Sequence, residues 1–464
     1  MKIASTVLLV ALLSGCAVTR VEPPAPVTAP SQFKETGLWQ RATPTAAVPD
    51  EWWRLFNDPV LDELQVKLVI GNENLKAAVA QVASARAQLE ASRSALWPTL
   101  SVGASASRAS NASSDSSVSA GPRNTVSLSA NASWEVDLWG RLSQATTAAQ
   151  ASLQASADDL AAARLSAQAT LAQSYFSLRA AEAQQALLER TVQAEQRSLE
   201  LTQARYQSGV AAQSDVLQAQ TLLKSTQASL TDTVAQRAQL EHALAVLLGQ
   251  PPSALSLARS AALPAPPVVP ELLPAALLQR RPDIAAAQRR VAAAYAQIGV
   301  ADAAFFPSLT LSASAGYRGS SLANLLSAPN LFWSLGPALA QAILDGGQRR
   351  LASAQARASA DQATATYRQT VLTALQEVED NLVLADQLQQ QAALQQEALQ
   401  SAQRLLEITL EQYRTGTVSY LNVVSAQTSA LSSERSLLDV RNRQLAALNQ
   451  LLKNIAGRWD NVQS

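Results

Sequence analysis

Cysteine and histidine are nearly absent from this chain, and their scarcity excludes several kinds of site. The 464 residues contain one cysteine, Cys16, and one histidine, His242. A single cysteine cannot form an intramolecular disulfide, and one residue of each type is too few to build a zinc or copper site. A serine-nucleophile motif of the form G-x-S-x-G is also missing. The sequence therefore predicts no enzyme, no metal site and no cofactor other than a covalent lipid.

Aromatic residues and glycine are scarce as well. Aromatics make up 5% of the chain and glycines number 16. Alanine, glutamine, serine and leucine dominate instead, which is typical of long helices rather than of a large compact core. Neither sign of charge is in excess, with 36 basic and 36 acidic residues, so there is no basic footprint for a nucleic acid. Beyond Cys16, no apolar run is long enough for a transmembrane helix.

The N-terminus carries a targeting signal. A basic start and an apolar run over 3–13 precede Leu13-Ser14-Gly15-Cys16. The run is too short to span a bilayer, which predicts a removable signal peptide over 1–15. The small residues before the cysteine resemble the bacterial lipobox, which implies a lipid on Cys16 and, with Ala17 behind it, sorting to the outer membrane. The alternative is an ordinary secretory signal with an incidental cysteine.

The rest of the chain is a tandem duplication. Ala204-Arg205-Tyr206-Gln207-Ser208-Gly209 is answered by Glu411-Gln412-Tyr413-Arg414-Thr415-Gly416, 207 positions later. Leu96-Trp97-Pro98-Thr99-Leu100-Ser101 matches Phe305-Phe306-Pro307-Ser308-Leu309-Thr310 at nearly the same offset. Repeats of this kind are sought first because they determine the architecture. We expect an anchor and Pro-rich extended segment, a first repeat, a linker and a second repeat, over 16–57, 58–257, 258–274 and 275–464.

Each half contains a stretch that alternates between apolar and polar residues, which predicts strands. We expect a β-hairpin over 99–136 and two further strands within 307–344, the last weakened by Gly336-Pro337. The strands are long enough to span a bilayer. One alternative is a small soluble sheet. Four strands cannot close a barrel, because the smallest bacterial barrels have about eight. A membrane barrel would therefore be shared between subunits, and the residues alone leave two or three copies open.

The remaining sequence is helical. Long runs over 141–208 and 348–415 lack proline and glycine, and their apolar residues recur at spacings of three, four and seven, which is the pattern of a coiled coil. At 1.5 Å per residue each run is about 100 Å long. Shorter helices precede the strands and follow the long runs, and we expect them over 59–96, 213–248, 282–305 and 418–456.

Taken in this order, the motifs resemble the TolC/OprM outer-membrane factors, specifically the lipoproteins that serve RND-type efflux pumps. The resemblance covers the whole mature chain. Besides the motifs above, it rests on Trp52-Trp53-Arg54-Leu55-Phe56-Asn57-Asp58-Pro59, Arg281-Pro282-Asp283-Ile284 and Leu344-Asp345-Gly346-Gly347.

The resemblance implies an α+β membrane protein of three subunits. The homotrimer would form a twelve-stranded β-barrel, four strands per chain, continued by a long periplasmic α-helical coiled-coil tunnel. The barrel would contact outer-membrane lipid, and the tunnel would meet a periplasmic adaptor (a membrane fusion protein) and an inner-membrane RND-type pump. Its function would be passive conduction of drugs or other small toxic compounds to the outside.

The resemblance also implies where functional residues lie. The two helix–helix turns would form the periplasmic gate and the adaptor-docking tips, with Tyr206, Gly209, Asp215, Tyr413, Gly416, Asn422 and Ser425. Both glycines are also expected to end their helices as left-handed C-caps. Both tyrosines could instead be packing residues of the apolar stripe along the coiled coil, here called the seam. TolC has acids on the returning helix of the second tip, where this chain has Asn422 and Ser425, so only Asp215 keeps an acid. Strand–helix junctions are expected at Gly140, Gly346 and Gly347.

Two other functions remain open. A pore-less coiled-coil lipoprotein scaffold would explain the helices and the anchor, but it has no use for lipid-facing hairpins. A type I protein-secretion duct would share the fold, although the lipobox disfavours it. The exported compound is not readable from the sequence.

Overall fold

The computed structural model describes residues 51–110, 122–269 and 280–456, together with 22, 25, 27–28, 30–35 and 37. The expected signal peptide, the lipid-attachment residue Cys16 and most of the Pro-rich segment lie outside these residues. No helix within the described ranges is both long and apolar enough to cross a membrane.

The chain divides into two compact units. The strand unit holds Ala80–Ala157 and Ala286–Arg368, and the helical unit holds Val27–Val79, Asp158–Ala285 and Gln369–Ser464. Each unit therefore combines parts of both halves of the duplication. The expected division at residues 258–274 separates the two repeats of the sequence, but it does not separate compact bodies.

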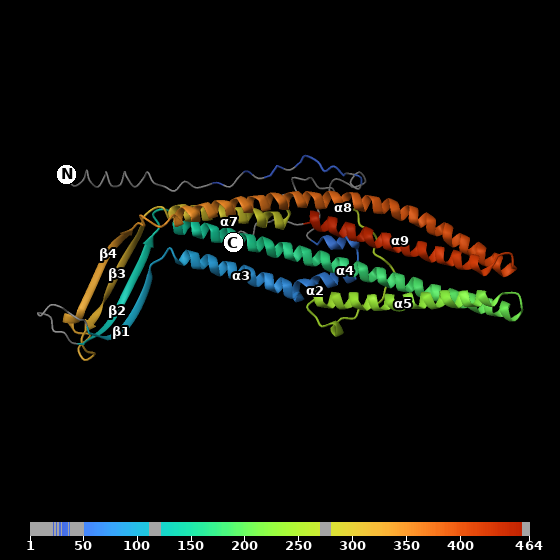
Figure 1. Cartoon of the computed structure of the whole chain (residues 1–464), viewed down its shortest axis with the longest axis horizontal. Helices are drawn as coiled ribbons and strands as arrows, with labels where there is room; N and C mark the ends of the chain where they lie inside the picture. The colour runs from blue at the N-terminus through green and yellow to red at the C-terminus, as the bar shows by residue number, and fades with distance from the viewer. Residues whose placement is uncertain are drawn as a thin grey trace. The chain divides into compact units, whose positions relative to one another are not determined.

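Four antiparallel strands form the sheet of the strand unit, in chain order (Figure 1). They are β1 (Thr99–Ala109), β2 (Arg123–Val136), β3 (Ser308–Gly319) and β4 (Leu331–Ala340). The predicted hairpin is confirmed at its bounds. The fourth strand continues through Gly336 and Pro337, although these two residues were expected to weaken it. Proline is tolerated there because β4 is an edge strand of the described sheet, where one side of the backbone needs no donor for a neighbouring strand.

The register separates the two faces of the sheet by chemistry. Leu100 pairs with Ala132, and Leu128 pairs with Tyr317, so apolar side chains share one face. The other face carries hydroxyl pairs, with Oγ–Oγ distances of 2.8 Å for Ser105 with Ser127 and for Ser314 with Ser334. Successive residues of a strand point to opposite faces, so the alternation seen in the sequence produces one apolar and one polar surface.

The helix before the first hairpin is broken. The sequence predicted one helix over 59–96, but α2 (Pro59–Gly71) and α3 (Glu73–Ser94) are separated by Asn72, whose ψ of 118° is not helical. Asn72 Oδ1 accepts from the N–H of Leu75 (3.0 Å), and Asn72 Nδ2 donates to Leu247 O (2.7 Å). A Cβ on Gly71 would lie 2.1 Å from Leu248 O. This close approach of two backbones explains the break.

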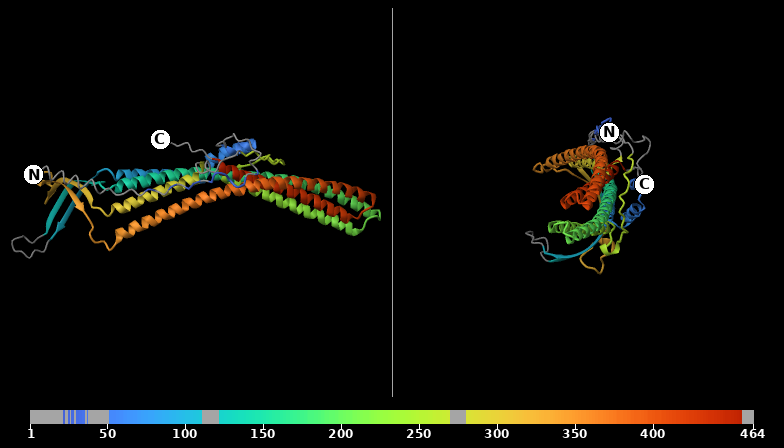
Figure 2. Two further views of the ribbon diagram at one scale, coloured as in Figure 1. Left: turned by 90° about the horizontal axis from the view of Figure 1, so that it is seen from above. Right: turned by 90° about the vertical axis from the view of Figure 1, so that its right-hand side faces the viewer.

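Four helices make up most of the helical unit, and the two longest of them begin in the strand unit. They are α4 (Arg141–Gln207), α5 (Gln213–Leu247), α8 (Gln348–Thr415) and α9 (Tyr420–Ile455). Within the helical unit α4 lies beside α5 and α8 beside α9 in each view (Figures 1 and 2). The observed bounds differ from the expected ones by two residues at most. The remaining helix, α7 (Pro282–Ala303), precedes β3.

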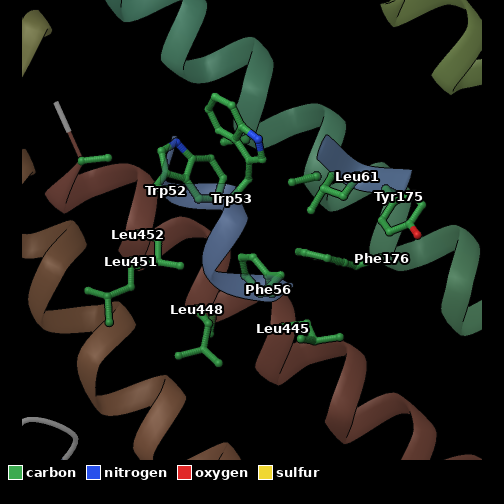
Figure 3. Close-up of a cluster of buried hydrophobic side chains, with 14 of the residues drawn as sticks. Trp52, Trp53, Phe56, Leu61, Tyr175, Phe176, Leu445, Leu448, Leu451 and Leu452 are labelled. Atoms are coloured by element: carbon green, nitrogen blue, oxygen red, sulfur yellow. The ribbon is translucent and has the colours of Figure 1, made fainter. Parts of the chain in front are cut away.

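An aromatic cluster forms the centre of the helical unit (Figure 3). Trp52, Trp53 and Phe56 belong to a 3₁₀ helix, η2 (Trp52–Phe56), and all three are buried. Phe56 packs against Phe176 of α4 with ring centroids 4.6 Å apart. Burying side chains of this size contributes about 1.5–3 kcal/mol each. The expectation of an extended segment up to residue 57 is therefore wrong for these residues, which are part of the core.

The described N-terminal residues are attached to α8. Phe33 is buried, and the backbone N–H groups of Lys34 and Glu35 donate to the two carboxylate oxygens of Glu379 at 2.7 and 2.9 Å. Hydrogen bonds to an ionised acceptor are stronger than neutral ones. This short stretch has no regular secondary structure, and it is fixed to the helix surface at this point.

Candidate functional site

Two turns join the long helices in pairs. The first turn covers residues 208–212, between α4 and α5, and contains Gly209 with φ +75°. The N–H of Gly209 donates to Tyr206 O (2.9 Å), and the N–H of Val210 donates to Arg205 O (2.9 Å). These two bonds make a Schellman motif, which satisfies carbonyl groups left over at a helix end. Glycine suits the position because an L side chain disfavours this φ.

The second turn, residues 416–419 between α8 and α9, repeats the same bonds. Gly416 has φ +83°. Its N–H donates to Tyr413 O (3.1 Å), and the N–H of Thr417 donates to Gln412 O (2.9 Å). Both glycines thus have the left-handed C-cap role that the sequence predicts. The duplication has preserved the turn as a backbone structure, although the side chains around it differ.

Tyr206 and Tyr413 occupy equivalent places in the duplication but have opposite surroundings. Tyr206 is 45% exposed, whereas Tyr413 is 3% exposed. Tyr413 belongs to a small apolar cluster with Tyr420, Leu223 and Val423. The rings of Tyr413 and Tyr420 are 5.4 Å apart in an edge-on arrangement. Tyr413 is therefore a packing residue between hairpins, and Tyr206 presents its ring to the surface.

The two turns are linked to one another through Arg205. Its guanidinium carbon lies 4.8 Å from the centroid of the Tyr413 ring, a cation–π distance. Its Nη1 donates to Arg414 O (3.1 Å), which is one of the last carbonyls of α8. Tyr413 Oη in turn donates to Thr202 Oγ1 on α4 (3.4 Å). Arg205 was not singled out from the sequence, since the duplication does not repeat it: the equivalent residue of the second half is Gln412.

Tyr420, at the start of α9, is a second residue that the sequence did not single out. It is 1% exposed, and its hydroxyl lies 3.3 Å from Ser198 Oγ of α4. Burial raises the pKa of Tyr420 above the usual value, and the negative charges of Glu195 and Asp215 add to the effect. The phenol is thus held neutral between the two hairpins.

The predicted polar residues of the returning helices lie on the outer side of this cluster. Asp215 is half-buried in the first turn of α5, where its N–H donates to Ala212 O (3.1 Å). A carboxylate suits a helix N-terminus because of the helix dipole. Asn422 and Ser425 are exposed, and the first turn of α9 has no acid. Of the two returning helices, α5 therefore has an acid in its first turn and α9 has none, as the sequence indicated.

A buried carboxylate lies deeper between α4 and α5. Glu195 is 3% exposed, Thr226 Oγ1 donates to its Oε1 (3.1 Å), and its Oε2 has no partner. Burial raises the pKa of Glu195, and the bond from Thr226 opposes the shift. Glu195 borders a groove of about 440 Å³ with Gln427 and Arg190. Within the described residues no group of acidic, histidine or cysteine side chains could hold a metal ion.

The strand–helix junctions contain the expected glycines. Gly140, Gly346 and Gly347 have φ values of +76°, +62° and +88°. Each junction also has an aspartate that caps the following helix. Asp137 accepts from the N–H groups of residues 142 and 143 at 3.0 and 2.8 Å. Asp345 accepts from Arg349 Nε at 2.7 Å, and this bond, with backbone donors, lowers the pKa of Asp345 to about 2.

Comparison with known proteins identifies the class to which this architecture is similar. The profile of the family described as outer membrane efflux protein matches residues 66–250 and 273–457, one match in each half of the duplication.

Individual relatives match over nearly the whole chain. It is 31% identical to the pyoverdine export outer membrane protein OpmQ of Pseudomonas aeruginosa over 455 residues, 97% of this chain and 95% of that protein. It is also 31% identical to the toluene efflux pump outer membrane protein TtgF of Pseudomonas putida, over 97% of this chain and 96% of that protein. The solved structure of the outer-membrane channel OprN is similar with a TM-score of 0.87 and 28% identity, covering 95% of this chain and 100% of that chain.

Proposed function

Because the chain belongs to the outer membrane efflux protein family, we propose that it is the outer-membrane exit duct of a tripartite efflux pump. It conducts small compounds passively from the periplasm to the outside. In this proposal an inner-membrane RND-type pump supplies the energy, and a periplasmic adaptor connects that pump to the duct.

The sheet carries this proposal. Its apolar face is not covered by any other part of the described chain, and Leu100, Trp333 and Leu335 are each 75% exposed. Side chains of this size are stable in such numbers only where lipid or protein covers them. Strands β1 and β4 are the edges of the described sheet, and exposed edges favour pairing with another chain.

Three copies would turn four open strands into a closed barrel of twelve. Closure removes every edge and gives lipid the apolar face and the pore the hydroxyl face. A homotrimer also places each turn residue on a three-fold ring. The two turns, with Tyr206, Asp215, Asn422 and Ser425 on their surface, are the proposed periplasmic gate and adaptor-docking tips. Arg205 and Tyr413 hold the turns together from inside.

A covalent lipid on Cys16 is proposed as a second membrane attachment. Acylation contributes about 0.8 kcal/mol per buried methylene, and the contact of Lys34 and Glu35 with Glu379 fixes the segment that follows. The substitution Cys16→Ser is expected to abolish labelling with radioactive palmitate while the protein is still exported. Unchanged labelling of the variant would show that the lipid is attached elsewhere, and a wild type that takes up no label would show that the lipid is absent.

The cargo is proposed only as a class. Relatives of equal identity are named for the export of pyoverdine and for the efflux of toluene. Because relatives equally similar to this chain are named for different compounds, the duct is expected to accept what the pump delivers.

The deciding experiment combines two measurements on the purified protein. We expect a heat-modifiable trimer on gels and single-channel currents in planar lipid bilayers. Deletion of the gene is expected to increase susceptibility to a panel of antibiotics, solvents, dyes and metals, and the intact gene is expected to restore resistance. A trimer without conductance would favour the pore-less scaffold instead.

A further inference from the structure

The charged residues of the sheet are distributed unevenly along the strands. The four strands contain three arginines, Arg108, Arg123 and Arg318, and a single acid, Glu135. All three arginines lie at the end of the sheet where the loops 110–122 and 320–330 connect the strands. Glu135 lies at the opposite end, next to the helices, and is bound through both oxygens by Arg141 at 3.0 and 2.7 Å.

The register assigns these arginines to different faces. Arg318 pairs with Ser127 and lies on the hydroxyl face. Arg123 pairs with Ala109 and has the same parity as Thr125 and Ser127, so it also lies on that face. Arg108 has the parity of Leu100 and Val102 and lies on the apolar face. Side chains two apart in a strand share a face, so these assignments follow from the pairing.

Arg318 is held over the hydroxyl face by an aromatic ring. Its guanidinium carbon lies 5.0 Å from the centroid of Phe332, which pairs with Gly316 on the neighbouring strand. A Cβ on Gly316 would lie 2.2 Å from Leu128 O, so glycine is required beside the ring. Within the described part of the chain, neither Arg123 nor Arg318 forms an ion pair with an acid. The one acid of the adjoining loops is Asp115, which lies outside the described residues.

From this arrangement we propose that the loop end of the hydroxyl face is an anion-attracting filter, with Arg318 and Arg123 as its selectivity residues. This inference rests on the proposed function, because it needs the hydroxyl face to line a pore. Three copies give two rings of three arginines. The rings are about 14 Å apart along the strands, since four residues separate Arg123 from Ser127, the partner of Arg318.

Rings of one sign of charge govern which ions enter a pore, and low-dielectric walls strengthen the effect. The rest of the described hydroxyl face has no unpaired charge to oppose the arginines, because its acid, Glu135, is neutralised by Arg141. The solutes favoured at this end are therefore small anions and compounds that carry carboxylate or phosphate groups. A neutral or cationic compound gains nothing from the rings.

The test is a reversal-potential measurement on purified full-length protein in neutral phosphatidylcholine bilayers under a potassium chloride gradient. The variant Arg318→Gln, alone and with Arg123→Gln, is expected to lower the chloride-to-potassium permeability ratio by roughly twofold or more at low salt. The difference should shrink in 1 M salt, where the Debye length falls to about 3 Å. Arg108→Gln is the matched control, because it removes the same charge at nearly the same height on the lipid face.

A second probe reports on the same end of the pore. Inositol hexakisphosphate added on the loop side is expected to block current through the wild type and less so through the double variant. If channels conduct but the arginine variants match the wild type in both measurements, the filter is refuted and the duct is not. If Arg108→Gln shifts selectivity as much as Arg318→Gln, the charges act from the lipid surface, and the proposal also fails. If no variant or wild-type protein conducts, the proposed function itself fails.

Discussion

The contact of Arg205 with the second turn allows a direct test of the proposed gate. Its guanidinium stacks on Tyr413 at 4.8 Å and donates to Arg414 O at 3.1 Å. Arg205→Ala removes both interactions without touching either glycine C-cap. A cation–π pair at a partly exposed site contributes about 0.5–1 kcal/mol. A solvent-accessible hydrogen bond contributes about 0.5–1.5 kcal/mol.

Together these contacts stabilise the association of the two turns by about 1–2.5 kcal/mol in each subunit. Since 1.4 kcal/mol is a factor of ten in an equilibrium, the substitution shifts the closed–separated equilibrium roughly 5- to 60-fold. Arg205→Lys keeps the charge but loses the planar stack, so an intermediate shift is expected.

Two assays measure this shift. Single-channel recordings are expected to show a higher open probability for Arg205→Ala, and cells are expected to become sensitive to vancomycin, a large antibiotic that enters through a leaking duct. The control is Arg197→Ala, because Arg197 is exposed on the same helix and its Nε bonds only to Gln193 O of its own helix at 3.2 Å. Wild-type conductance and sensitivity for an assembled Arg205→Ala trimer would refute the role of this contact.

Three further substitutions test the packing around the site. Glu195→Gln is expected to remove a pH dependence of the protein's stability. Burial raises the pKa of Glu195 in the folded protein, so the wild type loses stability as the pH rises from the ordinary glutamate pKa of about 4.3 through the raised pKa. Over that pH range the melting temperature should fall for the wild type and not for the variant. Gly209→Ala is expected to destabilise the first turn by about 1–2 kcal/mol, because alanine must adopt a left-handed φ, seen as faster hydrogen exchange there, whereas Gly103→Ala in β1 should change nothing. Glu182→Ala is expected to cost about 3–5 kcal/mol, because it leaves the buried Arg179 without an ion pair while Arg237 keeps its pair with Glu241. Thermal unfolding measures this cost against the exposed counterpart in the duplication, Gln389→Ala, which should cost almost nothing.

Features that follow from local periodicity were predictable. The long helices and the first hairpin appear within two residues of the expected bounds, because their patterns repeat many times along each element. The break at Asn72 was not predictable, since it depends on a backbone approach between Gly71 and Leu248, which are far apart in the sequence. The sequence carries no local sign of such a contact.

The site was predictable only in part for the same reason. Gly209 and Gly416 were visible as helix C-caps because the turn motif is local and duplicated. Tyr206 and Tyr413 lie at equivalent positions of that motif, so they could not be distinguished from the sequence. Their different exposure comes from Arg205 and Tyr420, which pack on Tyr413 alone. The seam on which each tyrosine lies is set by tertiary packing, and periodicity does not reveal it.

The two halves of the duplication bury equivalent helix positions under different segments of the chain, and the buried residues differ in chemistry. In the first half, buried ion pairs join Arg179 to Glu182 (2.6 Å) and Glu182 to Arg237 (3.1 Å). Arg179 Nη1 donates to the linker carbonyl Ala258 O (2.9 Å), and Arg237 Nη2 donates to Leu257 O just before the linker (2.8 Å). Tyr175 extends this network by donating to Asp58 Oδ2 (2.6 Å), and its pKa is raised by burial and by that bond.

In the second half, 207 positions later, the residues at these network positions form no ion pair within the described part of the chain. The equivalents of Tyr175, Arg179, Glu182, Arg237 and Glu241 are Leu382, Asp386, Gln389, Gln444 and Leu448. Leu448 is 2% exposed and packs in the aromatic cluster with Phe56 (Figure 3). The covering segment explains the difference. The linker presents backbone groups that need hydrogen-bond partners when buried, and Arg179 and Glu182 supply them. The helix η2 presents tryptophan and phenylalanine instead, which need an apolar surface. A duplicated helix pair can therefore keep its fold while its buried chemistry follows whichever segment lies on it.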